Sequence, residues 1–234
     1  MRLFFDTETN GKPSDKDKGI NTPIIVEPGY WPDIISICWM IYDDDLHIRT
    51  VYSIVNPLSY RKKEDIEWDM GAQRVHGIKF EDAIKGDDLE NVLGQFKRDY
   101  ELCDKIIAHN LRFDRNVVVN AFELISSDFE WNLEKDICTL CEAKKLIAKH
   151  NIPVNSAVGY RSFNLNNLYR HAFGKEPPAD AHNALRDVEV LKDVFFKLSG
   201  PGGDFTLPSL HILHPLPSHH RKSKSRTRKS PNKI

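Results

Sequence analysis

The sequence has no long hydrophobic run and no apparent internal repeat. Its longest apolar stretch, residues 34–42, falls far short of the roughly 20 residues that a membrane-spanning helix needs. A signal-peptide core is also missing, because Asp6 interrupts the apolar N-terminus. These absences argue against a membrane protein and against secretion. We expect a cytoplasmic or otherwise intracellular protein, with the nucleus as an option in a eukaryote.

Cysteine is scarce, with four residues in 234. The positions Cys38, Cys103, Cys138 and Cys141 suit a reducing compartment and argue against a disulfide framework. Cys138 and Cys141 form a C-x-x-C pair, but a structural zinc site needs two more ligands and none is visible at similar spacing. A redox pair would open a helix after a strand. We interpret both as ordinary small core or helix residues.

The charge is distributed unevenly along the chain. The formal net charge is −1, yet residues 215–234 contain seven basic residues and no acid. The basic residues of this tail are Arg221, Lys222, Lys224, Arg226, Arg228, Lys229 and Lys233. Residues 1–214 therefore carry −8. We expect one domain over residues 1–200 and a flexible Pro/His/basic tail over residues 201–234, which is a nucleic-acid arm, a partner-binding segment, a nuclear import signal or only a solvated tail.

Hydrophobic periodicity predicts an α/β domain with a mixed sheet, an antiparallel meander plus parallel strands, flanked by helices. Residues 12–32 are polar and rich in turn formers, so they indicate a loop. The predicted strands cover residues 2–5, 34–42, 47–55, 105–108 and 136–137. The predicted helices cover residues 64–75, 88–102, 112–124, 139–149, 163–173 and 182–198.

Two acids follow the first predicted strand. Side chains two apart on a strand point to the same face, so Asp6 and Glu8 are expected to project together. Two carboxylates in one small site repel each other and need a proton or a cation, for which a hard divalent metal is the natural choice. The alternative is that Asp6 ends the strand and Glu8 is a solvated loop residue.

Two later acids lie where an α/β sheet places functional groups. Asp114 follows a short strand at the start of a helix, and Asp187 lies on the polar side of the last helix, five residues after His182. Alone, Asp114 is explained by the helix dipole and Asp187 by a solvated helix face. Together with Asp6 and Glu8 they form a specific pattern, in which four acids occur in a fixed order along the chain.

This pattern resembles the DnaQ-like (DEDDh) exonuclease superfamily, which includes polymerase proofreading subunits. Asp6 and Glu8 match its first motif, residues 109–114 its second, and His182 with Asp187 its third. The resemblance spans residues 2–198 and implies a ribonuclease H-like fold in which the four acids hold two divalent cations, Mg²⁺ or Mn²⁺.

The resemblance also implies residue roles. His182 is the expected general base, because imidazole accepts a proton near neutral pH. Positions five apart do not share a helix face, so we expect His182 at the helix entrance. The residues expected to contact the terminal nucleotide are Thr7, Thr9, Asn10, His76 and Asn110.

We therefore predict a metal-dependent 3′–5′ exonuclease that releases nucleoside 5′-monophosphates from DNA. Its expected partners are single-stranded or frayed 3′ ends of nucleic acid, with a DNA polymerase or another replication or repair protein as a further candidate. The alternatives are an exoribonuclease that trims RNA and a weakly catalytic nucleic-acid-binding subunit of a polymerase complex.

Overall fold

The computed structural model describes residues 1–13, 30–150, 163–178 and 183–199, with backbone alone for residues 146–150. Most of the predicted loop and the whole basic tail lie outside these ranges. The strands are β1 (Arg2–Thr9), β2 (Ile34–Asp43), β3 (Leu46–Ile54), β4 (Lys105–Ala108) and β5 (Asp136–Cys138). The helices are α1 (Met70–His76), α2 (Phe80–Ala83), α3 (Leu89–Leu102), α4 (Leu111–Leu124), α5 (Thr139–His150), α6 (Leu165–Phe173) and α7 (Ala184–Leu198). No helix of the described residues is long and apolar enough to cross a membrane.

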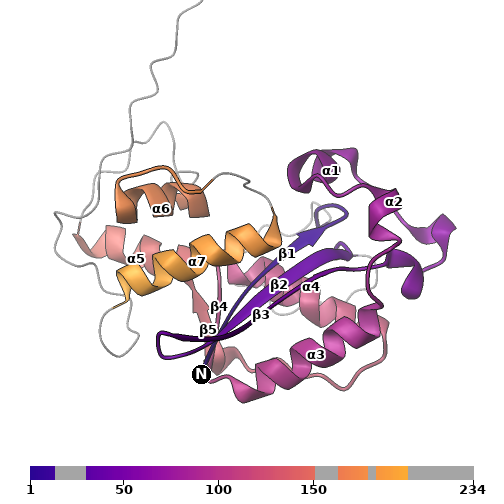
Figure 1. Cartoon of the computed structure of the whole chain (residues 1–234), viewed down its shortest axis with the longest axis horizontal. Helices are drawn as coiled ribbons and strands as arrows, with labels where there is room; N and C mark the ends of the chain where they lie inside the picture. The colour runs from indigo at the N-terminus through magenta and orange to yellow at the C-terminus, as the bar shows by residue number, and fades with distance from the viewer. Residues whose placement is uncertain (14–29, 151–162, 179–182, 200–234) are drawn as a thin grey trace, which may run out of the picture.

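The five strands form one mixed sheet in the order β3-β2-β1-β4-β5 (Figure 1). β1 pairs antiparallel with β2 and parallel with β4, so it lies in the middle of the sheet. β2 pairs antiparallel with β3, and β4 pairs parallel with β5. This sheet confirms the predicted fold class. Because β1 stays paired with β2 as far as Thr9, both Asp6 and Glu8 belong to the strand itself.

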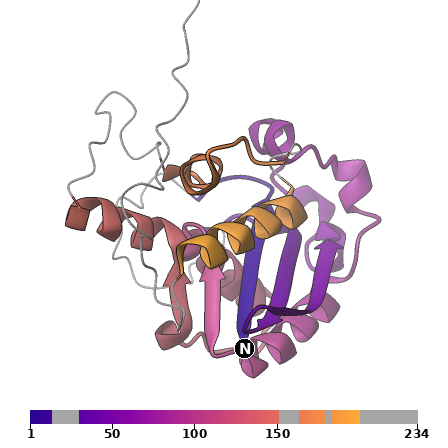
Figure 2. The same cartoon turned by 60° about the vertical axis from the view of Figure 1, so that its left-hand side comes forward.

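Helices cover both faces of the sheet. On one face, the orange helix α7 crosses β1 and β2 (Figures 1 and 2) and buries Val188, Leu191 and Phe195 against Phe4 and Met40. The opposite face is covered by α3 and α4, whose apolar side chains join a larger core. Burial of each such side chain contributes about 1.5–3 kcal/mol, so α7 is held firmly against β1.

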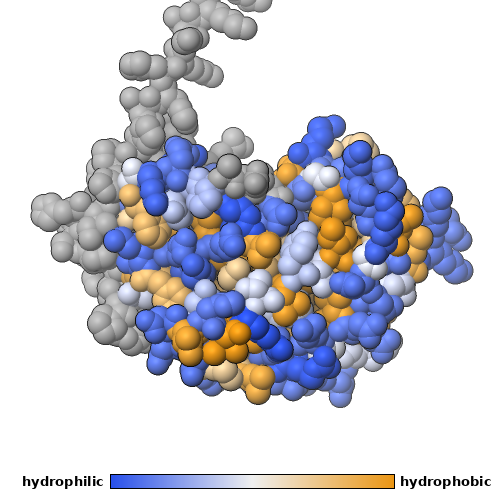
Figure 3. Space-filling view, viewed as in Figure 1, coloured by the Kyte–Doolittle hydropathy of each residue, from blue (hydrophilic) through white to orange (hydrophobic). Residues whose placement is uncertain are grey.

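The outer surface is mainly polar in the view of Figure 3, and its hydrophobic residues occur in separate patches. The exposed large hydrophobic side chains of the described residues include Leu46 and Ile48 on β3 and Met70 and Val75 on α1. Single exposed apolar residues are normal in folded proteins, so these positions need no special role.

The predicted helix over residues 64–75 is wrong in its first half. Residues 63–65 form a single 3-10 turn, and α1 begins only after Asp69, whose side chain accepts a hydrogen bond from the Gly71 amide. The Asp69 amide in turn donates to the backbone oxygen of Asn10 (2.9 Å). This tertiary contact keeps the segment before Asp69 extended. The predicted stop after His76 is confirmed, because Gly77 caps α1 at a φ of 76°.

Candidate active site

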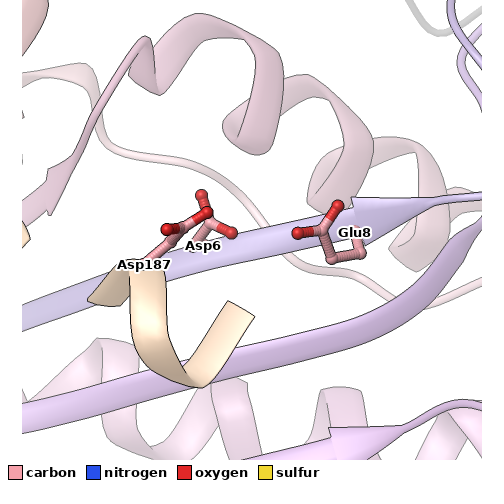
Figure 4. Close-up of side chains that lie close together, drawn as sticks. All are labelled: Asp6, Glu8 and Asp187. Atoms are coloured by element: carbon pink, nitrogen blue, oxygen red, sulfur yellow. The ribbon is translucent and has the colours of Figure 1, made fainter. Parts of the chain in front are cut away.

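Three carboxylates from two distant parts of the sequence meet on one face of the sheet. Asp6 and Glu8 project from β1 on the side covered by α7, and the first turn of α7 brings Asp187 to them (Figure 4). One oxygen from each of the three side chains lies within 4.8 Å of the others. The sequence predicted that these three acids share a site, and the structure brings them together.

Hydrogen bonds fix the first turn of α7, which carries Asp187, and apolar packing fixes the helix against the sheet. Asn183 caps α7 by accepting a hydrogen bond from the Leu185 amide (3.0 Å). The Asp187 amide donates to the Asn183 carbonyl oxygen (2.9 Å), which closes the first turn. Because the buried face of α7 packs against β1 and β2, this turn is fixed relative to Asp6 and Glu8.

Burial and mutual repulsion oppose ionisation of these acids. Burial is the largest cause that raises the pKa of Asp6 well above its usual value, and the charges of Asp114, Glu8 and Asp187 raise it further. Burial and the charges of Asp187 and Asp114 raise the pKa of Glu8 to about 8. Near neutral pH the metal-free site therefore retains protons that a bound cation would displace.

Asp114 is tied to β1 from the other side of the strand. It lies in the first turn of α4, is 3% exposed, and accepts two hydrogen bonds at Oδ1 from Thr7, one from the amide (3.0 Å) and one from the hydroxyl (2.8 Å). Burial raises the pKa of Asp114 to about 7, although both hydrogen bonds oppose that rise. Asp114 is not one of the three clustered acids, but its charge acts on Asp6.

The donor set fits a hard divalent cation. Carboxylate oxygens are the ligands that Mg²⁺ and Mn²⁺ prefer, and one or two carboxylates commonly suffice. Here three carboxylates converge, burial and repulsion hinder the ionisation of Asp6 and Glu8, and a fourth carboxylate, Asp114, acts on both of them. A cation would stabilise the ionised forms that burial and repulsion disfavour.

The predicted nucleotide-contacting residues after Glu8 are engaged within the protein. The Thr9 hydroxyl donates to the Gly11 carbonyl oxygen (2.8 Å). The Asn10 side chain donates to the Glu67 carbonyl oxygen (2.8 Å) and accepts from the Asp33 amide (2.8 Å). Asn10 therefore joins β1 to two loops, and its predicted contact with substrate stays a prediction.

His76 lies near Thr9 at the end of β1, and Asn110 lies at the start of α4. His76 Nδ1 accepts a hydrogen bond from the Ile78 amide (3.0 Å), and burial lowers the pKa of this imidazole while the nearby Thr9 backbone opposes that change. Asn110 is exposed and precedes α4 in the left-handed conformation, at a φ of 66°. His182 lies outside the described residues, two positions before α7 begins.

Comparison with models of protein families shows which family the chain belongs to. The model of the exonuclease family RNase_T matches residues 3–195, which cover all the strands and helices described above except Arg2 of β1 and the last three residues of α7. The chain belongs to this exonuclease family. The predicted superfamily is thereby confirmed, and the protein is assigned to the nucleases, an enzyme class within the hydrolases. Comparison with curated protein sequences gave no match.

The solved structures with a similar fold include several exonucleases. A structure of exonuclease I has a TM-score of 0.64 and 20% identity, covering 84% of this chain and 40% of that one. A 3′-exonuclease that recognises the histone mRNA stem-loop has a TM-score of 0.59 and 11% identity, covering 82% and 61%. Exonuclease X in complex with 5′-overhanging duplex DNA has a TM-score of 0.52 and 18% identity, covering 88% and 98%. This exonuclease chain thus spans less than half the length of the exonuclease I chain.

The sequence did not indicate Arg186, which precedes Asp187 in the first turn of α7. Its side chain is 6% exposed and donates from Nε (3.0 Å) and Nη2 (2.6 Å) to the carbonyl oxygen of Pro178. Its Nη1 lies 3.7 Å from Asp187 Oδ1. Arg186 and Val190 are four positions apart and share one face of the helix, and Val190 is buried. A charged residue on this apolar face was the sequence signal for a buried arginine.

A cavity of about 530 Å³ opens beside the end of β1 in this exonuclease, and Asn10, Trp31, Arg61 and Trp68 are part of its lining. Arg61 is held there by a two-pronged ion pair with Asp33, with Nε 2.8 Å from Oδ2 and Nη2 2.8 Å from Oδ1. Because these partners are 28 positions apart, no local sequence pattern connects them.

Proposed function

We propose that this protein is a metal-dependent 3′–5′ exonuclease that removes nucleoside 5′-monophosphates from the 3′ end of DNA. The observation that supports this most is the convergence of Asp6, Glu8 and Asp187 in a chain of the exonuclease family. Structural neighbours include exonuclease I in complex with DNA oligonucleotides and exonuclease X with duplex DNA, which favours nucleic acid as the partner.

In this proposal, different residues bind the cations, orient a carboxylate and accept a proton. Asp6, Glu8 and Asp187 hold the divalent cations, and Asp114 completes the set while Thr7 orients its carboxylate. When bound, two such cations lower the pKa of a coordinated water and offset negative charge on the phosphate. His182 accepts the proton of the attacking water.

The terminal nucleotide is expected beside the end of β1. The cavity next to Asn10 has a volume within the range of small-molecule sites, roughly 300–1,000 Å³, and Trp31 and Trp68 line it. Thr9 and His76 flank the same strand end. We place the last sugar and base here, so that the scissile phosphate reaches the carboxylates.

RNA is the competing substrate, because one structural neighbour is a 3′-exonuclease of an mRNA stem-loop. A polymerase or repair complex is a candidate partner, with the basic tail of residues 215–234 as its attachment or as an arm for nucleic acid.

The test uses single-stranded DNA and RNA of the same sequence, labelled at either end, with Mg²⁺, Mn²⁺ or EDTA. The proposal predicts a ladder from 5′-labelled DNA, immediate release of labelled mononucleotide from 3′-labelled DNA, and no cleavage in EDTA. Faster degradation of RNA would move the substrate assignment to RNA. Internal cuts, release from the 5′ end, or cleavage without metal would contradict the mechanism.

A further inference from the structure

The C-x-x-C pair lies at a strand-to-helix junction. Cys138 is the last residue of β5, α5 begins at Thr139, and Cys141 is in the first turn of that helix. Cys38 and Cys103 are buried in the core, whereas Cys138 and Cys141 are only partly buried. The pair therefore has the placement expected of a redox pair, which the sequence pattern alone did not establish.

The geometry allows the two sulfurs to join. Cys138 and Cys141 are three positions apart across the turn from β5 into α5, and a disulfide would need their Cβ atoms about 3.5–4.5 Å apart. In this protein the Cys138 and Cys141 side chains are near enough to act on each other's pKa. A small adjustment at the junction of β5 and α5 would bring the two sulfurs within bonding distance.

The surroundings of Cys138 favour its thiolate. The Cys141 thiol and the backbone amides of Cys141, Leu111 and Asn110 lie near its sulfur and stabilise a negative charge there. These amides belong to the starts of α5 and α4, so the positive ends of two helices meet at one sulfur. The Cys141 contact and these amides lower the pKa of Cys138 to about 6, while the same contact raises the pKa of Cys141.

We propose that Cys138 and Cys141 form a redox-active dithiol that is converted reversibly into an intramolecular disulfide by a low-molecular-weight disulfide such as glutathione disulfide. Cys138 is the attacking residue and Cys141 the resolving residue. This site uses none of the three clustered carboxylates, although the charge of Cys138 acts on Asp114.

The reaction proceeds in two balanced exchanges. The Cys138 thiolate attacks one sulfur of glutathione disulfide, which forms a mixed disulfide and releases one glutathione thiolate. The negative charge on Cys138 is then gone, so Cys141 loses its proton more easily and attacks the Cys138 sulfur. The second glutathione leaves. Two protein thiols are oxidised, one glutathione disulfide is reduced to two glutathione molecules, and a reductant reverses both steps.

A metal-binding role is not supported among the residues that the structure describes. The cluster of potential ligands found there contains only Asp6, Glu8 and Asp187. The two cysteines thus lack the further ligands that a structural zinc site requires.

The test equilibrates the purified full-length protein in glutathione buffers of increasing oxidised fraction, traps free thiols with an alkylating reagent, and maps the peptides by mass spectrometry. We expect the four free thiols to fall to two, with a Cys138–Cys141 cross-link that dithiothreitol removes. Cys141→Ser should accumulate glutathione on Cys138, and Cys138→Ser should leave Cys141 unmodified. Cys38→Ser, which alters a buried cysteine, should still form the cross-link.

Mapping the unmodified protein keeps the test valid even if a variant folds poorly. The proposal is overturned if all four thiols stay free in oxidised buffer, if the only disulfides join separate chains, or if Cys38 or Cys103 reacts before Cys138.

Discussion

Thr7 connects two of the acids in the candidate site. It lies between Asp6 and Glu8 on β1, and both its amide and its hydroxyl donate to Asp114. A side chain between two candidate cation ligands that also holds a third acid influences the shape of the site. The sequence could not indicate the contact with Asp114, because it spans 107 positions, and the predicted contact of Thr7 with the nucleotide stays a prediction.

Thr7→Val removes the hydroxyl and keeps the branched shape of the side chain. We expect cleavage or metal affinity to fall by about 10–100-fold, as for other residues that orient metal ligands, with a loss in stability of about 1 kcal/mol. Steady-state cleavage and thermal unfolding measure the two effects. Thr7→Ser retains the hydroxyl and serves as the matched control. Equal activity of the valine and serine variants would show that the hydroxyl does not orient Asp114.

The start of α7 depends on Arg186, which joins this helix to Pro178 across a short stretch that contains His182. Arg186→Met keeps much of the side-chain length but cannot donate to Pro178. We expect kcat to fall about tenfold or more while KM changes little, because positioning rather than substrate binding is lost. Arg186→Lys should restore part of the rate. A change confined to KM would instead indicate direct contact with substrate.

His109 joins the end of β4 to the start of α5. Its Nδ1 lies 2.9 Å from the Thr139 hydroxyl, and burial lowers the pKa of His109 to about 4. In the unfolded chain the pKa is about 6.5, so between these values the unfolded state binds more protons. His109 therefore contributes stability above about pH 6.5 that is lost as the pH falls toward 4.

We expect acidification from neutral pH to about pH 4.5 to cost wild type on the order of 2 kcal/mol more than His109→Asn. Urea unfolding at several pH values measures this difference. The raised pKa values of the clustered acids act in the opposite direction in both proteins, so the comparison isolates His109. Parallel pH profiles for the two proteins would contradict a buried neutral imidazole.

Long segments with clear periodicity were predicted well, and short segments set by distant contacts were not. The apolar stripes of α3, α4 and α7 are regular, and each helix begins within two residues of its predicted start. The segment before α1 also looked helical, but the contacts from Asn10 to Glu67 and Asp69 hold it extended. Tertiary hydrogen bonds there outweigh a local preference worth a few tenths of a kcal/mol per residue.

Asp99 joins three elements of the domain and is fully buried. From α3 it accepts a hydrogen bond from Trp39 Nε1 on β2 (2.7 Å) and forms an ion pair with Arg49 on β3. Asp99→Ala leaves a buried indole N–H and an arginine without their acceptor, so we expect a loss of about 3 kcal/mol of unfolding free energy. Denaturant unfolding measures it, with Asp128→Ala as the exposed control. A loss no larger than that of the control would mean that Asp99 does not hold the sheet to α3.

The convergence of three acids could be predicted because each lies in an element with a clear sequence pattern. Asp6 and Glu8 share a strand face, and Asp187 lies in the first turn of a clearly periodic helix. The pairing of Arg61 with Asp33 was not predictable, because only the folded chain brings these residues together. The surroundings of Cys138 were not predictable for the same reason, because the amides near its sulfur come from the starts of two helices.

The central claim is that Asp6, Glu8 and Asp187 bind the divalent cation that this exonuclease requires. Calorimetric titration of Mn²⁺ into the metal-free protein tests it most directly, with Asp187→Asn and the matched control Asp193→Asn, which removes an acid from the same helix outside the cluster. We predict that wild type and Asp193→Asn bind Mn²⁺ alike, whereas Asp187→Asn binds at least tenfold more weakly. Unchanged binding by Asp187→Asn, or equal weakening in both variants, would contradict the assignment.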